Sequence, residues 1–234
     1  MREAHSRLYQ EWICRIIQFL NKIISSIFSL FNYSSSIKEY ILTYTFICDA
    51  MLGRLAKNLR FFGFDTIYVG DLEKNRRMND PSIGERPLED KEILEIAIQS
   101  GRTILTKDDQ FAARDPVRVV LIDGKNVRDQ FVFLKNYLGL SFNFDQANSR
   151  CYKCNEILEK VPKLSVEGRV NENTFVAFEN FWECPICKKL YWKGSHFRQE
   201  NGLLAKFDGL LDDTWELGDY SRTNFPLLVQ SWTW

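Results

Sequence analysis

The sequence has no net charge, because its 31 Lys and Arg residues balance its 31 Asp and Glu residues. Global charge therefore argues neither for nor against a polyanionic partner. The charges are unevenly distributed, however. Residues 207–234 hold five acidic residues and a single basic one, so residues 1–206 carry a charge of +4. This imbalance slightly favours nucleic-acid binding by the main part of the chain.

The sequence also lacks a run of about 20 apolar residues of the kind that crosses a membrane. Its most apolar segment, residues 15–31, carries polar residues such as Arg15, Asn21 and Lys22 at helical spacing. This pattern predicts an amphipathic helix in an N-terminal extension, residues 1–44. A secretory signal would be shorter and more uniformly apolar, so we expect neither a transmembrane span nor secretion. The helix could pack on the protein or on a protein partner, attach to a membrane surface, or lie outside the folded unit.

The six cysteines are not arranged as in a secreted disulfide framework. Close pairs in a chain without a secretory signal indicate a metal site in a reducing compartment, so we expect an intracellular protein of the cytoplasm or nucleus. Four thiolates predict a closed, structural Zn²⁺ site, and a redox dithiol is the rival interpretation. Cys48, outside the pairs, is interpreted as a buried small hydrophobe. The two Cys-x-x-Cys pairs are Cys151/Cys154 and Cys184/Cys187.

No internal repeat is present, and short strand-like and helix-like segments alternate between residues 44 and 138. This alternation predicts an α/β domain, residues 45–140, with a parallel sheet and helices on both faces. A turn-rich module with an aromatic strand at 175–182 follows at residues 150–198, and an acidic, aromatic tail spans 199–234. The expected strands are 44–48, 66–69, 103–105 and 117–122, the expected helices are 51–62, 89–100 and 126–138, and residues 73–87 are expected to form a loop.

Three carboxylates fall where such a sheet would gather them. Asp49 and Asp108 follow two predicted strands, and Asp90 lies at the start of a predicted helix. Parallel strands end at the same edge of a sheet, which is where α/β folds bind ligands. Clustered carboxylates repel one another unless a divalent cation neutralises them, so the pattern predicts a Mg²⁺ or Mn²⁺ site suited to phosphodiester hydrolysis. Asp109 or Asp123 is a candidate fourth acid. Each acid could equally cap a helix or open a turn.

Basic and aromatic residues make up the candidate RNA-binding surface. Arg54, Lys57 and Arg60 recur along one face of the first predicted helix, where they could bind phosphates or simply face solvent. In the cysteine-rich module, interleaved aromatic and basic residues could stack bases or form the small core, and for Trp182 the core is favoured. The candidate RNA-binding residues of this module are Lys188, Lys189, Tyr191, Trp192, Lys193 and His196.

Five separate motifs occur in a specific order along the chain. They are FICDAMLGRLAKNLRFFGFD at 46–65, EDKEIL at 89–94, GRTILTKD at 101–108, CYKCN at 151–155 and CPICKKLYWKGSH at 184–196. Together they resemble the Mut-seven C-terminal RNase family, a PIN-like nuclease fused to a zinc ribbon. The resemblance implies a PIN-like fold, a zinc ribbon, and Asp49, Asp90 and Asp108 as acidic metal ligands. The segment 73–87 is longer than expected for the family, and residues 1–45 and those beyond about 198 have no counterpart in it.

The sequence thus predicts a metal-dependent ribonuclease with a zinc ribbon that assists RNA binding. The alternative is a catalytically inactive RNA-binding adaptor of the same fold. Three carboxylates argue against the adaptor, because a pure binder of polyanions gains nothing from clustered negative charge. An interaction module built on the N-terminal helix and the tail is a third hypothesis. Oligomeric state is not indicated by any of these patterns.

Overall fold

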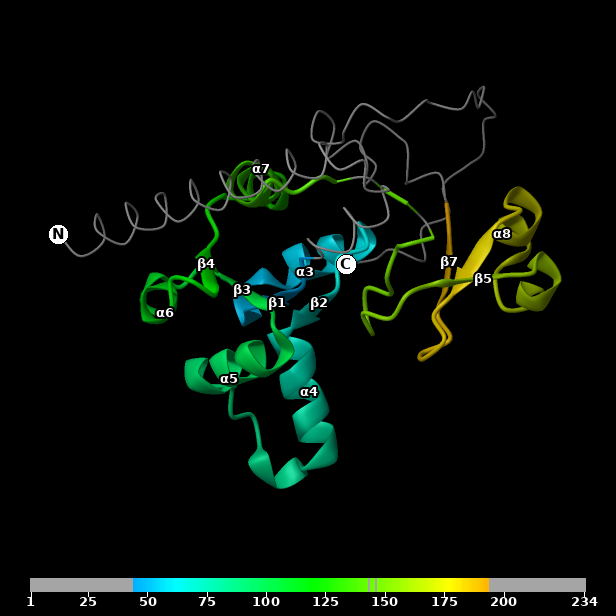
Figure 1. Ribbon diagram of the computed structural model, residues 1–234. Helices are drawn as coiled ribbons and strands as arrows, with labels where there is room; N and C mark the ends of the chain where they lie inside the picture. Colours follow the sequence, from blue (N-terminus) through cyan, green and yellow to red (C-terminus); the bar gives the residue numbers. More distant parts are fainter. Residues whose placement is uncertain (1–43, 143, 146, 194–234) are drawn as a thin grey trace, which may run out of the picture.

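The computed structural model describes residues 44–142, 144–145 and 147–193. The predicted N-terminal helix, His196 and the tail at 199–234 lie outside the described residues. Figure 1 shows two sheets side by side, one parallel and central, the other formed by the cysteine-rich part of the chain. Within the described residues, no helix is both long enough and apolar enough to cross a membrane.

The first sheet is parallel throughout, as the alternating pattern predicts. Its strands are β1 (Phe46–Cys48), β2 (Thr66–Tyr68), β3 (Thr103–Thr106) and β4 (Val119–Leu121), in the order β2-β1-β3-β4. Ile47 in β1 lies opposite Ile67 in β2 and Ile104 in β3. The chain leaves β1 for β2 and then returns to the other side of β1 to form β3. The strand order therefore reverses between β1 and β3, which is where open α/β sheets form their ligand sites.

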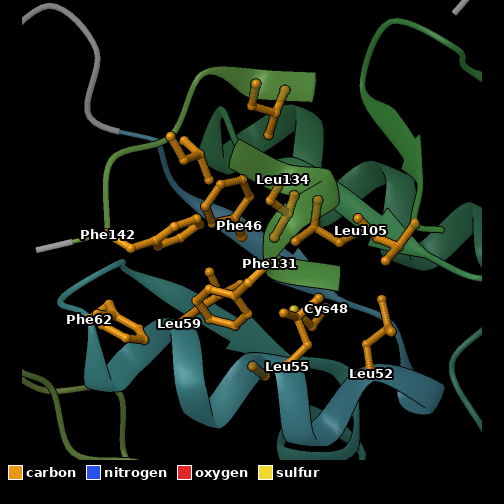
Figure 2. Packing of buried hydrophobic residues seen from close by; sticks show 14 of the residues in the cluster. Phe46, Cys48, Leu52, Leu55, Leu59, Phe62, Leu105, Phe131, Leu134 and Phe142 are labelled. Carbon is orange, nitrogen blue, oxygen red and sulfur yellow. The ribbon is translucent and has the colours of Figure 1, made fainter. Parts of the chain in front are cut away.

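Helices cover both faces of this sheet, as predicted. One face packs against α3 (Gly53–Phe61) and α7 (Val127–Leu138), and the other against α5 (Asp90–Ser100) and α6 (Asp109–Arg114). In the close-up view of Figure 2, Leu55 and Leu59 of α3 lie beneath the sheet, with Phe131 of α7 beside them. Each such side chain, when fully buried, contributes about 1.5–3 kcal/mol. This core keeps the strand ends, and the acids that follow them, in fixed positions.

The expected loop at 73–87 is wrong in its first half. Residues Val69–Asn79 form helix α4, followed by the 3-10 helix η2 (Pro81–Ile83). Periodicity gave no sign of α4, because Val69 is its single buried residue. Its charges suit a helix nonetheless, with Asp71 in the first turn and Arg76 and Arg77 in the last, where each opposes the partial charge of the helix end. The second strand accordingly ends at Tyr68, one residue earlier than expected.

The second sheet is antiparallel and consists of β5 (Glu159–Val161), β6 (Phe181–Glu183) and β7 (Leu190–Trp192). The expected aromatic strand at 175–182 is wrong over most of its length. Residues Glu172–Ala177 form helix α8, because the side chain of Asn171 caps the helix by accepting a hydrogen bond from the Thr174 amide at 2.7 Å. A 3-10 helix, η3 (Lys163–Val166), precedes α8 and places Val166 in the core.

The two parts of the chain are joined by packed residues. Phe142 and Phe144, which follow α7, are buried in the core of the first domain. The first Cys-x-x-Cys turn also contacts that domain. Asn155 accepts a hydrogen bond from the amide of Thr66 at 3.0 Å and donates one to the carboxylate of Asp65 at 2.6 Å. The cysteine-rich module is therefore docked on the edge of the parallel sheet.

Candidate functional site

The hydroxyl of Thr106 links two of the three predicted acids at the carboxyl edge of the sheet. Thr106 is fully buried at the end of β3 and donates a hydrogen bond to Oδ2 of Asp49 at 2.7 Å. The same hydroxyl oxygen accepts a hydrogen bond from the amide of Asp108 at 3.0 Å. Asp49 and Asp108 thus lie together where the strand order reverses. Sequence reasoning missed Thr106, although the sequence places it at the end of a predicted strand, two residues before Asp108.

Both acids also have the capping roles that the sequence left open. Oδ1 of Asp49 accepts a hydrogen bond from the amide of Ala50 at 2.6 Å. Oδ1 of Asp108 accepts two from the first turn of α6, from the amides of Gln110 at 2.8 Å and Phe111 at 3.1 Å. Within the described residues, Oδ2 of Asp108 accepts no hydrogen bond. A carboxylate offers about four lone-pair sites, so these bonds fix the orientation of each carboxylate and leave sites for a cation.

Asp90 is placed less directly. It is the first residue of α5 and not its cap, because Glu89 caps this helix in a reciprocal arrangement with Glu92. Oδ2 of Asp90 forms an ion pair with Arg114 at 3.2 Å. Within the described residues, the three acids are not gathered to within 4.8 Å of one another. Asp109, the candidate fourth acid, begins α6 and is exposed.

Three further side chains that sequence reasoning missed lie near Asp49. The hydroxyl of Tyr68, at the end of β2, donates a hydrogen bond to the carbonyl of Ala50 at 2.9 Å. Burial, and then the charges of Asp71, Glu73 and Asp49, raise the pKa of Tyr68 above its ordinary value. The carboxyl edge is therefore more acidic than the predicted three acids alone imply. Asp71 and Glu73 were missed because their helix, α4, was interpreted as a loop.

Two glycines make room for the Tyr68 ring. A Cβ atom at Gly70 would lie 2.6 Å from the ring, and one at Gly53 would lie 2.9 Å from it. No real Cβ approaches another atom that closely, so the ring occupies a slot that only glycine leaves open. Its hydroxyl holds the turn that carries Asp49.

The three basic residues of α3 do not share one environment. Arg54 is exposed, and Nζ of Lys57 lies 5.8 Å from the centre of the Tyr152 ring. Arg60 is 3% exposed, so little of its side chain faces the solvent from which RNA would bind. Its guanidinium donates hydrogen bonds within the protein.

Arg60 connects three parts of the molecule. Its Nε donates to the carbonyl of Thr66 at 2.8 Å, and its Nη1 donates to Asp71 at 2.9 Å and to the carbonyl of Tyr152 at 2.6 Å. Thr66 begins β2, Asp71 lies in α4, and Tyr152 lies in the first Cys-x-x-Cys turn. The residue therefore joins the two domains through hydrogen bonds of its Nε and Nη1.

The four cysteines converge as a metal site requires. The thiol sulfurs of Cys151, Cys154, Cys184 and Cys187 lie within 4.8 Å of one another. With Zn–S bonds of about 2.3 Å, a tetrahedral site places its sulfurs about 3.8 Å apart. The Cys151 and Cys187 sulfurs are separated by 3.7 Å, so this donor set fits Zn²⁺.

The two Cys-x-x-Cys turns have the same geometry. In each, the amide of the second cysteine points at the sulfur of the first, at 3.4 Å for Cys154 and 3.5 Å for Cys187. In each, the residue after the second cysteine has a positive φ, 63° at Asn155 and 59° at Lys188. Burial, above all other effects, raises the pKa of Cys184 to about 11. Burial also opposes ionisation of Cys187, but hydrogen bonds, first that of the Lys189 amide, outweigh it and lower the pKa of Cys187. The positive charge of a bound metal would favour the thiolate form of the set.

Several predicted RNA-binding residues of this module have structural roles. Tyr191 is 4% exposed, and its hydroxyl donates to the Cys151 sulfur at 3.0 Å, so the residue packs within the cysteine cluster. The centres of the Trp192 and Phe181 rings lie 6.1 Å apart. Both rings are on the face of the second sheet opposite to that of Trp182. Lys188 lies 3.7 Å from Glu183 and remains mostly exposed.

Two lysines of this module contact aromatic rings. Nζ of Lys189 donates to the Tyr152 hydroxyl and lies 4.5 Å from the centre of that ring. Nζ of Lys193 lies 5.6 Å from the centre of the Phe144 ring. Tyr152 thus has lysines of both domains beside it, Lys57 from α3 and Lys189 from the ribbon. Cys48 is fully buried, and burial raises its pKa, as expected of a structural cysteine.

Comparison with known proteins gives one match. The family model described as Mut7-C RNAse domain matches residues 44–204, which include both sheets and all four clustered cysteines. No curated protein and no solved structure matches the chain.

Proposed function

The chain belongs to the Mut7-C RNAse domain family, and from that premise we propose that it is a metal-dependent ribonuclease with a PIN-like nuclease domain and a zinc ribbon. The observation that supports this proposal most directly is the hydrogen-bonded arrangement of Asp49, Thr106 and Asp108 at the point where the strand order reverses. Two oriented carboxylates at that point supply part of the oxygen ligands that a hard cation needs.

Asp49, Asp90 and Asp108 are the proposed ligands of Mg²⁺ or Mn²⁺, with Asp109 as a further candidate. Their donor set consists of carboxylate oxygens, which these ions prefer. When bound, such an ion supplies an activated water and neutralises charge on the phosphodiester as it is cleaved. Asp90 now forms an ion pair with Arg114, which it would have to give up to become a ligand of the ion.

The chain's own residues set the geometry of this site. Thr106 fixes the carboxylate of Asp49 from inside the core, and the first turn of α6 fixes that of Asp108. Neither side chain has to search rotamers when substrate arrives, and such preorganisation lowers the entropic part of the barrier. Tyr68 holds the turn after β1 from the other side.

RNA is proposed to run along α3 towards the ribbon. Arg54 and Lys57 are one helical turn apart, a rise of about 4.5 Å, and Lys57 leads to Tyr152 and Lys189 of the ribbon. Cations spaced in this way can contact successive phosphates of one strand. The Zn²⁺ site, closed by four cysteines, is proposed to be structural and to hold the ribbon's basic and aromatic residues in place.

The test is cleavage of end-labelled single-stranded and hairpin RNA with Mn²⁺, Mg²⁺ or EDTA. Asp49→Asn and Asp108→Asn should abolish cleavage and retain RNA binding. Asp80→Asn is the matched control, because Asp80 is an exposed cap of η2 at the far end of α4 and its replacement should leave the rate unchanged. Cutting that persists in Asp49→Asn and Asp108→Asn would place the reaction elsewhere.

One observation favours the second candidate, an inactive RNA-binding adaptor. The ion pair between Asp90 and Arg114 neutralises the acid that a metal would need, and the three acids are not gathered within 4.8 Å in the described residues. The same assay separates the two functions. Tight RNA binding without cleavage under any metal establishes the adaptor, and metal-dependent cleavage that needs Asp49 excludes it.

A further inference from the structure

A cleft of about 620 Å³ lies between the second sheet and the segment that follows α7. One wall is formed by Leu158, Lys160 and Trp182 of the ribbon, and the opposite wall includes Phe144. Lys193 lies at its border, beside the Phe144 ring. The cleft belongs to neither the acidic edge nor the zinc site, and junctions between domains are common places for ligands.

The pairing of β5 with β6 determines which side chains of the second sheet face the cleft. Lys160 of β5 and Trp182 of β6 are directly paired in the antiparallel ladder, so their side chains lie on the same face of the sheet. Trp182 is partly exposed, although the sequence favoured a place in the core for it. Trp182 packs against the cysteine cluster and also lines the cleft, together with Lys160.

Three polar groups at this wall are not used within the described residues. Lys160 is exposed and forms no ion pair there, and neither the indole N–H of Trp182 nor the side-chain amide of Asn180 forms a hydrogen bond there. The one acidic residue among those that line the cleft, Asp145, accepts hydrogen bonds from the Ala147 amide at 2.9 Å and from Asn148 at 2.8 Å. The unused groups are therefore mainly donors.

We propose that this cleft binds one unstacked nucleotide of single-stranded RNA, with the base stacked on Trp182 and a neighbouring phosphate bound by Lys160. This subsite deepens the proposed ribonuclease function and rests on it for the identity of the polymer. An aromatic face accepts any base, and the amide of Asn180 can hydrogen-bond to a base edge. A base that is paired in a duplex cannot enter such a cleft, so the subsite selects unpaired RNA.

The experiment measures binding and not cleavage, in an Asp49→Asn background that leaves RNA intact. Fluorescence anisotropy with a labelled single-stranded RNA compares Trp182→Leu with Phe175→Leu. Phe175 is a partly exposed aromatic residue of α8 that does not line the cleft, so its replacement serves as the matched control. Loss of a base–aromatic stack weakens binding by about 5- to 150-fold, so we expect that loss for Trp182→Leu and little change for Phe175→Leu. A duplex RNA of the same sequence should bind both variants equally.

Bound zinc, measured in each variant, shows whether the ribbon stays folded. Lys160→Ala provides a second test, since Lys160 is exposed and its replacement does not disturb packing. It should reduce the slope of log affinity against log salt by about 0.7, as expected when one phosphate contact with a single strand is lost. If Trp182→Leu retains zinc and full affinity, the subsite is wrong. If Trp182→Leu loses zinc, an unchanged salt slope in Lys160→Ala overturns it instead.

This result is independent of the nuclease test. If the subsite fails, RNA binding is unaffected by these variants while the wild-type chain still cuts RNA. If the nuclease proposal fails, no metal supports cutting, yet the affinity loss in Trp182→Leu is still measured.

Discussion

Replacing Arg60 by methionine tests our proposal that two basic residues on one helix have different roles, Arg60 in stability and Arg54 in RNA binding. Arg60 and Arg54 belong to the same basic row of α3, but Arg60 is 3% exposed whereas Arg54 is exposed. Methionine keeps an unbranched apolar stem and removes the guanidinium. The matched variant is Arg54→Met.

The expected cost follows from the groups that Arg60 would leave behind. The carbonyls of Thr66 and Tyr152 would lose a donor, and an unsatisfied buried acceptor costs about 1–3 kcal/mol. The carboxylate of Asp71 is 39% exposed, so water replaces its lost partner and its contribution is small. We therefore expect Arg60→Met to lower the free energy of unfolding by about 2–6 kcal/mol. At about 2–4 °C per kcal/mol, the melting temperature falls by about 4–24 °C.

The assays are thermal unfolding with zinc present and RNA binding at several salt concentrations. Arg54→Met should change stability by less than about 0.5 kcal/mol and reduce the salt dependence of binding, because one phosphate contact is lost. Arg60→Met should leave the salt dependence unchanged at a temperature where it remains folded. A stable Arg60→Met variant with reduced salt dependence would refute the structural role and restore the assignment of Arg60 to the RNA surface.

Three further outcomes follow from the described contacts. Arg114→Ala should lower the Mn²⁺ concentration for half-maximal cleavage, because Asp90 no longer exchanges an ion pair for the metal; a higher requirement would show that Arg114 assists the metal site. Burial opposes ionisation of Asp65, but hydrogen bonds from Arg102 and Asn155 outweigh it and lower the pKa of Asp65. Its stabilisation is therefore present above the unfolded-state pKa of about 3.9 and is lost as pH falls through the lower folded-state value, so Asp65→Asn should flatten the acid end of a stability–pH curve. Removing zinc with a chelator should raise hydrogen exchange in β2 as well as in the ribbon, since the first cysteine turn is bonded to Thr66; exchange confined to the ribbon would show that the domains unfold independently.

Local patterns were sufficient to predict the parallel sheet and the convergence of the four cysteines. Alternating apolar segments predicted β1 to β4 with helices on both faces, because a short buried strand and an amphipathic helix each have a recognisable period. The spacing of the cysteine pairs predicted that the thiols converge, as they do to within 4.8 Å. The position of Asp49 and Asp108 after two strands predicted that both lie at one edge of the sheet.

Other elements gave no such signal. Helix α4 buries a single residue, so it has no apolar stripe to detect. Helix α8 is capped by Asn171, and its aromatic residue was assigned to a strand instead. Both were missed because the pattern of apolar residues was weighted above helix capping and end charges.

What the sequence determined by itself is the set of elements and the chemistry of the two clusters, because periodicity, strand ends and cysteine spacing are local properties. Only the tertiary structure decided which side chains of those elements stay exposed and can contact a ligand. Arg54 and Arg60 are equivalent on an isolated helix, and Tyr191 and Trp182 are both aromatic residues of one small sheet. Arg60 is buried where it donates a hydrogen bond to the carbonyl of Tyr152. Tyr191 is buried where its hydroxyl donates a hydrogen bond to the sulfur of Cys151. These contacts join residues far apart in the chain, and burial depends on such neighbours and not on the residue's own pattern.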